Sequence, residues 1–276
     1  SLLIEKGARM NEQDLKGRTP VMAAAGKGHA DVAALLISHG GKVNAKDLDE
    51  KTALMLAVER GYPQIVQLLV SGGAKIDVRD RHGNTPLMEA VKRACRDCAG
   101  ILIAKEADLN VQNRSGETVL MTAAGKGNTE MVTLLLEKGA DVNTASESRW
   151  TALTAAVNSG KRDIVEILAE HGADLNGQDS MGRTPLMKAL EKGHIPIAKL
   201  LIERGADVNA ADIEGRTVLM WAAESSKDVV KILLSKDVNV NIKAKDGSTA
   251  LSHALEKNQR EIVELLKIRG AVEEGE

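Results

Sequence analysis

The sequence predicts an all-α solenoid of stacked helix–turn–helix units, because three observations agree. A threonine recurs every 33 residues along the 276-residue chain, and repetition at such a period indicates a stack of small structural units. Each period carries two short apolar patterns with helical spacing. The chain has no Phe, one Tyr and two Trp, so small aliphatic and Met side chains must fill the core. The repeating threonines are Thr19, Thr52, Thr85, Thr118, Thr151, Thr184 and Thr217, with Thr249 following after 32 residues.

Asparagines and glycines recur in phase with these threonines. The asparagines are Asn11, Asn44, Asn110, Asn143, Asn176 and Asn209, with Asp77 in the remaining place. The glycines are Gly7, Gly40, Gly73, Gly139, Gly172 and Gly205. Together the ladders predict a single domain over 1–276, with a partial repeat at 1–13 and repeats beginning near residues 14, 47, 80, 113, 146, 179, 212 and 244.

One period shows how the two helices arise. Residues 179–182 form a turn, Thr184 caps a first helix, and Pro185 suits the first helical position because its missing N–H needs no partner. This helix stops near Gly193, and a second one ends at Gly205, the expected left-handed cap. Each helix has only about eight to ten residues, too few to be stable alone in water. Neighbouring repeats must therefore supply the packing.

Three recurring motifs resemble those of the ankyrin repeat family. They are TPLM at Thr85 and Thr184, GH at Gly28 and Gly193, and GADVN at Gly139 and Gly205. The resemblance covers nearly the whole chain. It implies β-hairpin-like tips and first helices on a concave face, second helices on the convex back, and a function in binding proteins.

The chain departs from the family pattern at a row where the family usually has His. Three residues after the threonine stand Met22, Met55, Met88, Met121, Met187 and Met220. Such a row could be a ladder of soft metal ligands, but flexible core filler explains thioethers at every layer better. We expect these methionines to form an apolar row where the family has hydrogen-bonding histidines.

Other departures fall at turns and at the two ends. Glu50 and Arg149 replace glycine at hairpin tips, and Glu106 and Asp237 replace the capping glycine, so these four residues are expected in altered or strained turns. One residue is missing between Trp221 and Asp228, which shortens the link between the helices of the seventh repeat. Leu2 and Leu3 align with a second helix, so we expect the chain to begin inside one, with further sequence upstream. Ser252 in the Met row and the final Glu273, Glu274 and Glu276 indicate a polar terminal cap.

Composition argues against several classes of protein. A net charge of −2 and a pI near 6.3 give no general attraction to nucleic acid or to an anionic membrane. The sequence has no apolar stretch long enough for a membrane span and no signal peptide, and two cysteines make no disulfide framework. We expect a cytoplasmic, monomeric protein that binds no membrane and for which a protein partner is favoured over nucleic acid.

Candidate chemistry is sparse. Cys95 and Cys98 have the spacing of half a zinc site or of a redox pair, but the other half of a zinc site is missing, and structural cysteines are the favoured interpretation. His82 and His253 have no catalytic partner at a known spacing. The GKG strings at 26–28 and 125–127 lack the spacing of a phosphate loop. We therefore expect no catalytic site, no cofactor and no metal.

The expected concave face carries an uneven charge. In repeats one to four it holds ten cations against four acids (Asp49, Glu59, Glu89 and Glu117), an excess of six. The cations are Lys16, Arg18, Lys27, Lys51, Arg60, Arg81, Lys92, Arg93, Arg114 and Lys126. In repeats five to eight, six cations meet six acids, and the cations are Arg183, Lys188, Lys192, Arg216, Lys245 and Lys257.

Both tryptophans fall in the register of this face, Trp150 one residue before its threonine and Trp221 four after. Because Trp and Arg are enriched in binding hot spots, we expect a partner along the face, with an acidic part against repeats one to four and an apolar anchor near the tryptophans. Either Trp could instead simply cover the neighbouring repeat. The predicted contact residues are Trp150, Trp221, Arg18, Lys51, Arg60, Arg81, Lys92, Arg93, Arg114, Lys126, Arg183, Lys188 and Arg216. The alternative hypothesis is a regulatory or sensor domain of a larger protein that holds a phosphorylated small ligand.

Overall fold

The structure, a computed structural model, describes residues 7–236 and 238–272. It forms two compact units, Ser1–Ala123 with Glu137–Asp141 and Ala124–Leu136 with Val142–Glu276, here called unit 1 and unit 2. The predictions for Leu2, Leu3, Asp237 and the final glutamates fall outside the described residues.

The described residues form sixteen helices in pairs, which confirms the predicted helix–turn–helix repeat. The first helices of the pairs are α2 (Pro20–Lys27), α4 (Ala53–Arg60), α6 (Pro86–Lys92), α8 (Val119–Lys126), α10 (Ala152–Asn158), α12 (Pro185–Glu191), α14 (Val218–Ser225) and α16 (Ala250–Glu256). The second helices are α3 (Ala30–Ser38), α5 (Pro63–Ser71), α7 (Arg96–Ala104), α9 (Thr129–Glu137), α11 (Arg162–Glu170), α13 (Ile195–Glu203), α15 (Lys227–Leu234) and α17 (Arg260–Ile268).

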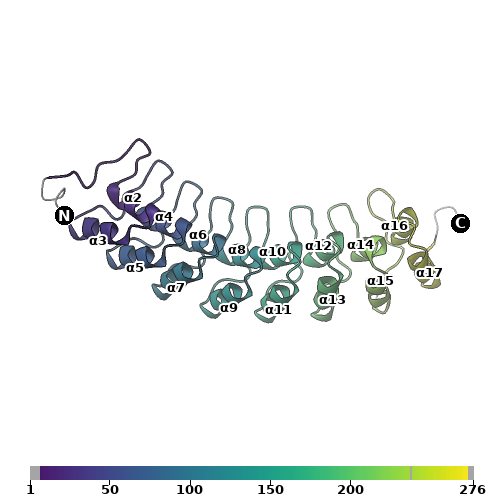
Figure 1. The fold of residues 1–276 in the computed structure, drawn as a ribbon. Helices are drawn as coiled ribbons and strands as arrows, with labels where there is room; N and C mark the ends of the chain where they lie inside the picture. The colour runs from purple at the N-terminus through teal and green to yellow at the C-terminus, as the bar shows by residue number, and fades with distance from the viewer. Residues whose placement is uncertain (1–6, 237, 273–276) are drawn as a thin grey trace. The chain divides into compact units, whose positions relative to one another are not determined.

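Within each unit, first helices pack against neighbouring first helices and second helices against second helices (Figure 1). Unit 1 contains α2 to α7, and unit 2 contains α10 to α17. The boundary between the units falls within α8 and at the end of α9. Each unit is thus built of two helical layers, one per helix of the repeat.

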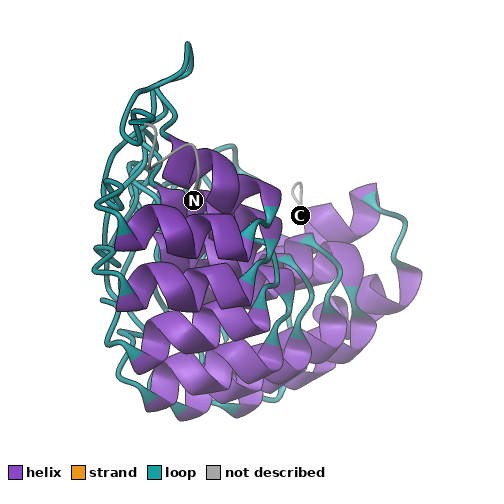
Figure 2. Ribbon diagram, turned by 60° about the vertical axis from the view of Figure 1, so that its left-hand side comes forward, coloured by secondary structure: helices purple, strands orange, loops and turns teal. Residues whose placement is uncertain are grey.

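The loops that join successive repeats follow a hairpin course without forming strands. Figure 2 shows the described part of the chain as helices and loops alone, and one isolated bridge pairs Ala211 with Thr217. In the second repeat the backbone N–H of Asp47 donates to the carbonyl of Lys51 at 2.9 Å, which closes the hairpin. Leu48 N–H donates to the carbonyl of Lys16 at 3.1 Å, so neighbouring tips are joined by backbone hydrogen bonds.

The threonine ladder is a ladder of helix caps. Thr52, for example, is extended, and its Oγ1 accepts the backbone N–H of Met55 at 3.4 Å. The Met row is buried, as expected, but it is not wholly apolar. The sulfurs of Met22 and Met220 lie 3.4 Å from the backbone nitrogens of Thr19 and Thr217 and accept weak hydrogen bonds from them. The expectation of a purely apolar rung was therefore too simple.

The asparagine ladder joins each repeat to the next. Asn44 Oδ1 accepts the backbone N–H of Lys75 at 2.8 Å, and its Nδ2 donates to the carbonyl of Gly73 at 3.0 Å. Asn143 makes the same pair of hydrogen bonds, to Asp174 and Gly172. Both backbone groups lie in the loop that follows a second helix, so each asparagine ties this loop to the loop of the preceding repeat.

The strained turns predicted from sequence are observed where the structure describes them. Glu50, Arg149 and Glu106 have φ of 60°, 62° and 62°, in the left-handed region that favours glycine. Ala94 and Asn258 also have positive φ, 57° and 55°, which the sequence analysis did not anticipate. Both stand where other repeats have a glycine between their two helices.

In the shortened seventh repeat, a single serine forms the whole link between the two helices. Ser226 alone separates α14 from α15 and is extended, with φ −155°. Its Oγ accepts the backbone N–H of Val229 at 3.3 Å, so one residue both ends the first helix and caps the second.

Candidate interaction surfaces

The first-helix surface of unit 1 holds nine of the ten cations counted in repeats one to four, and several of them are paired within the chain. Arg18 pairs with Asp14 at 2.8 Å, Arg81 with Asp49 at 2.8 Å, and Arg93 with Glu89 at 2.6 Å. These pairs involve two of the four acids of that face, Asp49 and Glu89, together with Asp14. The sequence count therefore overstates the positive charge that is available to a ligand.

Lys51 is also neutralised. Its ammonium group pairs with Glu59 on the same repeat, and both side chains are about one-fifth exposed, at 24% and 17%. Burial lowers the pKa of Lys51, but the hydrogen bond and negative charge of Glu59 outweigh this effect, so the pKa lies above its usual value. Lys51 is fixed as a cation inside an ion pair.

Five of the nine cations make no ion pair with any described residue, and three of these five lie at the ends of first helices: Lys27, Arg60 and Lys92. Each is the last residue of its helix, α2, α4 and α6 respectively, and α4 packs between α2 and α6. We call these three residues the cation strip. A cation at a helix C-terminus is stabilised by the helix dipole, which gives each of them a structural reason to be there as well.

The remaining counted cations, Lys16, Arg114 and Lys126, also lack an ion pair among the described residues. Arg114 is exposed at a hairpin tip, where its backbone N–H donates to the carbonyl of His82 at 2.9 Å. Lys126 ends α8 and belongs to unit 2.

Two exposed leucines occupy hairpin tips of unit 1, a feature that the sequence analysis missed. Leu15 is fully exposed and Leu48 is 75% exposed. The backbone hydrogen bond from Leu48 to Lys16 brings the two tips together. Aliphatic side chains four residues before the threonine, where the third and fourth repeats have Arg81 and Arg114, are the sequence signal that identifies them.

In unit 2, Trp221 lies in a network of its own neighbours. The guanidinium carbon of Arg216 lies 3.8 Å from the ring centroid, and the indole N–H donates to Asp212 Oδ2 at 3.3 Å. Arg216 also pairs with Glu224 at 2.5 Å. These contacts all lie within the seventh repeat, and they favour a structural role for Trp221 there.

Trp150 is held less firmly. The ammonium nitrogen of Lys188 lies 5.9 Å from its ring centroid, at the outer limit of a cation–π contact. Lys188 itself is 9% exposed and pairs with Glu191 at 2.9 Å, and Glu191 in turn accepts from Arg183 at 3.2 Å. The half-buried indole of Trp150 makes no hydrogen bond to a described residue, so its N–H remains available to a ligand.

In the structure, His253 has side-chain partners that the sequence spacing did not indicate. Its Nδ1 lies 2.9 Å from Glu224 Oε1, and its Nε2 lies 3.1 Å from Ser248 Oγ. The order Ser–His–Glu suggests a hydrolase triad, but the single hydroxyl proton of Ser248 goes to Asp246 Oδ1 at 2.7 Å, because a carboxylate can only accept. The hydroxyl proton is therefore not directed at His253, as it would be in an activated serine.

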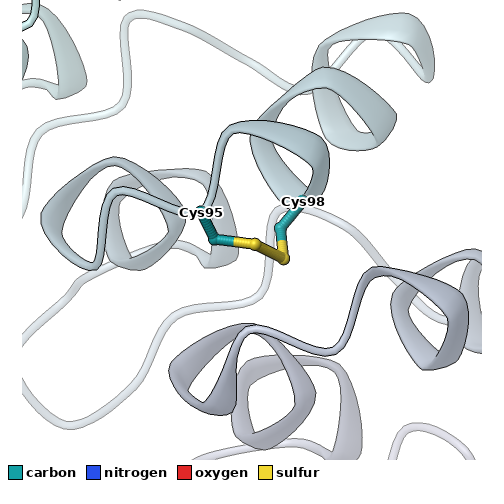
Figure 3. Close-up of a disulfide and its surroundings, with 2 residues drawn as sticks. All are labelled: Cys95 and Cys98. Carbon is teal, nitrogen blue, oxygen red and sulfur yellow. A yellow bond between two sulfur atoms is a disulfide. The ribbon is translucent and has the colours of Figure 1, made fainter.

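The CRDC motif forms a disulfide in this structure. Cys95 caps α7, Cys98 is fully buried in its first turn, and the two sulfurs are bonded (Figure 3). The burial of Cys98 at an apolar helix position agrees with the sequence analysis, which did not predict the pairing. Over 7–236 and 238–272, no three His, Cys, Asp or Glu side chains gather as metal ligands would.

These features define a repeat protein made of helix pairs with hairpin-like links. The sequence matches the family described as ankyrin repeats (3 copies) over residues 1–80, 73–146, 144–212 and 210–273, and the chain belongs to the ankyrin repeat family. Domains of this family generally mediate protein–protein interactions and are typically non-catalytic.

A solved structure supports the same assignment. It is described as the crystal structure of the ankyrin repeat domain of Bcl-3, a unique member of the IkappaB protein family. The two chains are 31% identical, with a TM-score of 0.71, over 79% of this chain and 99% of that one. A search of curated proteins finds no match. None of the helices in the described residues combines the length and hydropathy needed to cross a bilayer.

Proposed function

We propose that this chain is a non-enzymatic scaffold whose unit 1 binds an acidic segment of a protein partner through the cation strip. The observation that carries the proposal is that Lys27, Arg60 and Lys92 make no ion pair with a described residue, while Arg18, Lys51, Arg81 and Arg93 all do. Each of these three cations can form an ion pair with a carboxylate of the partner without first breaking an ion pair within the chain. Opposite charge also speeds the encounter of the two proteins.

The exposed leucines add a place for apolar contact. Leu15 and Leu48 are on neighbouring tips of the same unit, and a partner that covers them removes apolar surface from water. A segment that combines acidic and aliphatic residues is therefore the chemistry that unit 1 fits. Arg114, at another tip of this unit, extends the positive surface.

Trp150 is proposed as an aromatic contact in unit 2. Its ring is half-buried and its N–H has no hydrogen-bond partner among the described residues, whereas Trp221 has Arg216 and Asp212. Of the two tryptophans, Trp150 is the one that can offer both a face and a donor to a partner without losing a contact that it already has.

The test uses the full chain as bait for affinity purification and mass spectrometry. The triple variant K27Q/R60Q/K92Q removes the strip, and K42Q/K75Q/K105Q is the matched control, because those lysines are also exposed, unpaired and in unit 1. Loss of three exposed charge pairs at about 0.5 kcal/mol each predicts roughly tenfold weaker binding of the recovered partner by the first variant. Equal binding by the two variants would overturn the proposal.

A phosphorylated small ligand is the second candidate, because three unpaired cations on adjacent helices also suit a polyanion. A thermal-shift screen with nucleotides and inorganic phosphate separates the two candidates, since a bound ligand raises the melting temperature by mass action. A shift that the K27Q/R60Q/K92Q variant abolishes favours the sensor hypothesis. No shift favours the protein partner.

A further inference from the structure

We propose that Cys95 and Cys98 form a reversible thiol–disulfide exchange site, in which Cys95 is the sulfur that an external thiol attacks and Cys98 is the resolving thiol. The two α-carbons are 5.3 Å apart, with two residues between them on the first turn of α7. Cys95 is half-buried, while Cys98 has no exposed surface. Cys98 is therefore shielded from solvent, and Cys95 is the more accessible of the two residues.

The start of α7 suits a thiolate. Cys95 is the N-cap of this nine-residue helix, no side chain caps the helix there, and Cys98 is its third residue. The backbone N–H groups of a first helical turn and the positive end of the helix dipole stabilise a nearby anion such as a thiolate. Along the chain, Lys92 and Arg96 lie within three residues of Cys95, against one acid, Asp97, while Arg93 is paired with Glu89.

A purely structural disulfide explains this arrangement less well. The stabilisation from a disulfide grows with the length of the loop that it closes, and this one spans only a single helical turn. The bond holds no separate segments of the chain together. Its contribution to stability through chain entropy is therefore small.

The sister repeats show that the turn does not need the bond. Cys95 has φ −80° and ψ 87°, and the residues at the same place in four other repeats, His29, Tyr62, Lys161 and Gln259, have φ between −84° and −104° and ψ between 68° and 80°. None of them is cross-linked, and each starts a helix of nine residues. The reduced and oxidised forms can thus share one backbone, so exchange does not require unfolding.

Glutathione is a suitable probe of the exchange. In oxidation the Cys95 thiolate attacks one sulfur of glutathione disulfide, forming a mixed disulfide and releasing one glutathione thiolate. The Cys98 thiolate then attacks Cys95 Sγ, closing the intramolecular bond and releasing the second glutathione thiolate. The two cysteine sulfurs lose two electrons, which reduce the two glutathione sulfurs, and the two thiol protons pass to the departing thiolates. Reduction is the same sequence in reverse.

The experiment equilibrates the full chain in buffers of graded glutathione to glutathione-disulfide ratio, quenches with acid, alkylates free thiols and counts them by mass. We expect one transition between two free thiols and none, while circular dichroism stays at its folded value throughout. Two variants distinguish the role of Cys95 from that of Cys98, and each introduces a residue type found at the same position in other repeats. C98V introduces an aliphatic side chain, as at Ile65 and Ile197, and C95H introduces the histidine found at His29 and His194. C98V should accumulate the glutathione adduct on Cys95, and C95H should form an adduct at least tenfold more slowly.

Three results would overturn the proposal. One is that both thiols stay free at every ratio in the folded chain. Another is that the disulfide is reduced only under conditions that also abolish the circular dichroism signal. The third is that C95H forms its adduct as fast as C98V, which would mean that Cys98 is not the shielded thiol.

Discussion

The first-helix surfaces of the two units are built on the same repeat register but use their cations differently. In unit 1 the last residues of three successive first helices, Lys27, Arg60 and Lys92, make no ion pair with a described residue. In unit 2, Arg183 and Lys188 meet Glu191, while Arg216 meets Glu224 and the ring of Trp221. Unit 2 also has exposed cations that make no ion pair with a described residue, namely Lys126, Lys192, Lys245 and Lys257. The units therefore differ in arrangement: in unit 1 such cations end three successive first helices, whereas in unit 2 the first helices α10 and α14 end at Asn158 and Ser225.

A single residue at an equivalent repeat position decides whether a cation of this surface is paired. Lys51, Arg183 and Arg216 each precede a capping threonine by one residue, and each pairs with a glutamate eight residues later, Glu59, Glu191 or Glu224. Where the glutamate is missing, as in the first repeat with Gly26, the pair cannot form. The number of unpaired cations on such a surface therefore depends on these spacings as well as on the number of Lys and Arg.

The largest effect is expected in the cores, where the units should not differ. Leu54 in α4 and Leu186 in α12 have the same register and no exposed surface. L54A and L186A should each lower the free energy of unfolding by about 3 kcal/mol, because each leaves a buried cavity. Urea denaturation of both variants measures this. If the two losses differed by more than about 2 kcal/mol, the two units would differ in their cores as well as on their surfaces.

The second-largest effect on stability is expected for the two tryptophans. W221A should destabilise unit 2 by about 2 kcal/mol, through loss of the Arg216 stack, the hydrogen bond to Asp212 and covered apolar area, whereas W150A should cost about 1 kcal/mol. The same denaturation experiment ranks the two. W221F keeps a ring beneath Arg216 and loses only the N–H, so it should fall between wild type and W221A. The reverse ranking of W150A and W221A would contradict the assignment of Trp221 as the structural ring.

A third prediction concerns two aspartates that pair with an arginine four residues later. Burial raises the pKa of Asp179, but hydrogen bonds from the Arg183 backbone, the Arg183 side chain and the Met181 backbone outweigh it, so the pKa lies below its ordinary value. Ionised Asp179 therefore stabilises the fold above the pKa of the unfolded chain, and this contribution is lost as the pH falls through the lower folded pKa. D179N should cost about 1 kcal/mol at pH 7, and the cost should vanish in strong acid.

Asp14 is the counterpart in unit 1. Hydrogen bonds from the backbone and side chain of Arg18 lower its pKa to about 2, but its side chain is 44% exposed, against 7% for Asp179. D14N should therefore change stability less than D179N at neutral pH, because solvent screens the exposed pair. Unfolding followed at several pH values measures both. A larger effect at Asp14 would contradict the role given to burial.

The smallest effect is expected at the turns between paired helices. Ala94 in unit 1 and Asn258 in unit 2 occupy one register with φ of 57° and 55°. A94G should stabilise the chain by about 0.5 kcal/mol, because glycine adopts this conformation without strain, whereas N258G should be close to neutral because asparagine tolerates it. Melting temperatures of the two variants, with the cysteines in the same redox form, make the comparison. A stabilisation by N258G greater than that by A94G would count against it.

Sequence reasoning predicted the fold and much of its local detail, since these follow from periodic, short-range signals. The threonine caps and the left-handed conformations at Glu50, Arg149 and Glu106 follow from residue type and register alone. The asparagine ladder was visible as a pattern, but its bonds to the next repeat, such as Asn44 to Lys75, became clear only with the backbone in place.

The interaction surfaces were predicted less well, because side-chain pairing depends on geometry that spacing does not contain. Counting charges placed Lys51 and Arg93 among the available cations, whereas both are paired with a glutamate. The link from Ser248 through His253 to Glu224 crosses two repeats and has no sequence signature. The eight-residue spacing of Lys51 and Glu59 is a signal that could have identified one class of these pairs.

The most direct test of the difference between the two surfaces is the salt dependence of partner binding. The partner recovered with the full chain is titrated against wild type, K27Q/R60Q/K92Q and the control K42Q/K75Q/K105Q, from about 50 to about 200 mM salt, a range over which screening of exposed charges changes strongly. The account predicts that affinity falls with salt for wild type and control, and that the strip variant starts weaker and falls less steeply. The same slope in all three proteins would contradict it.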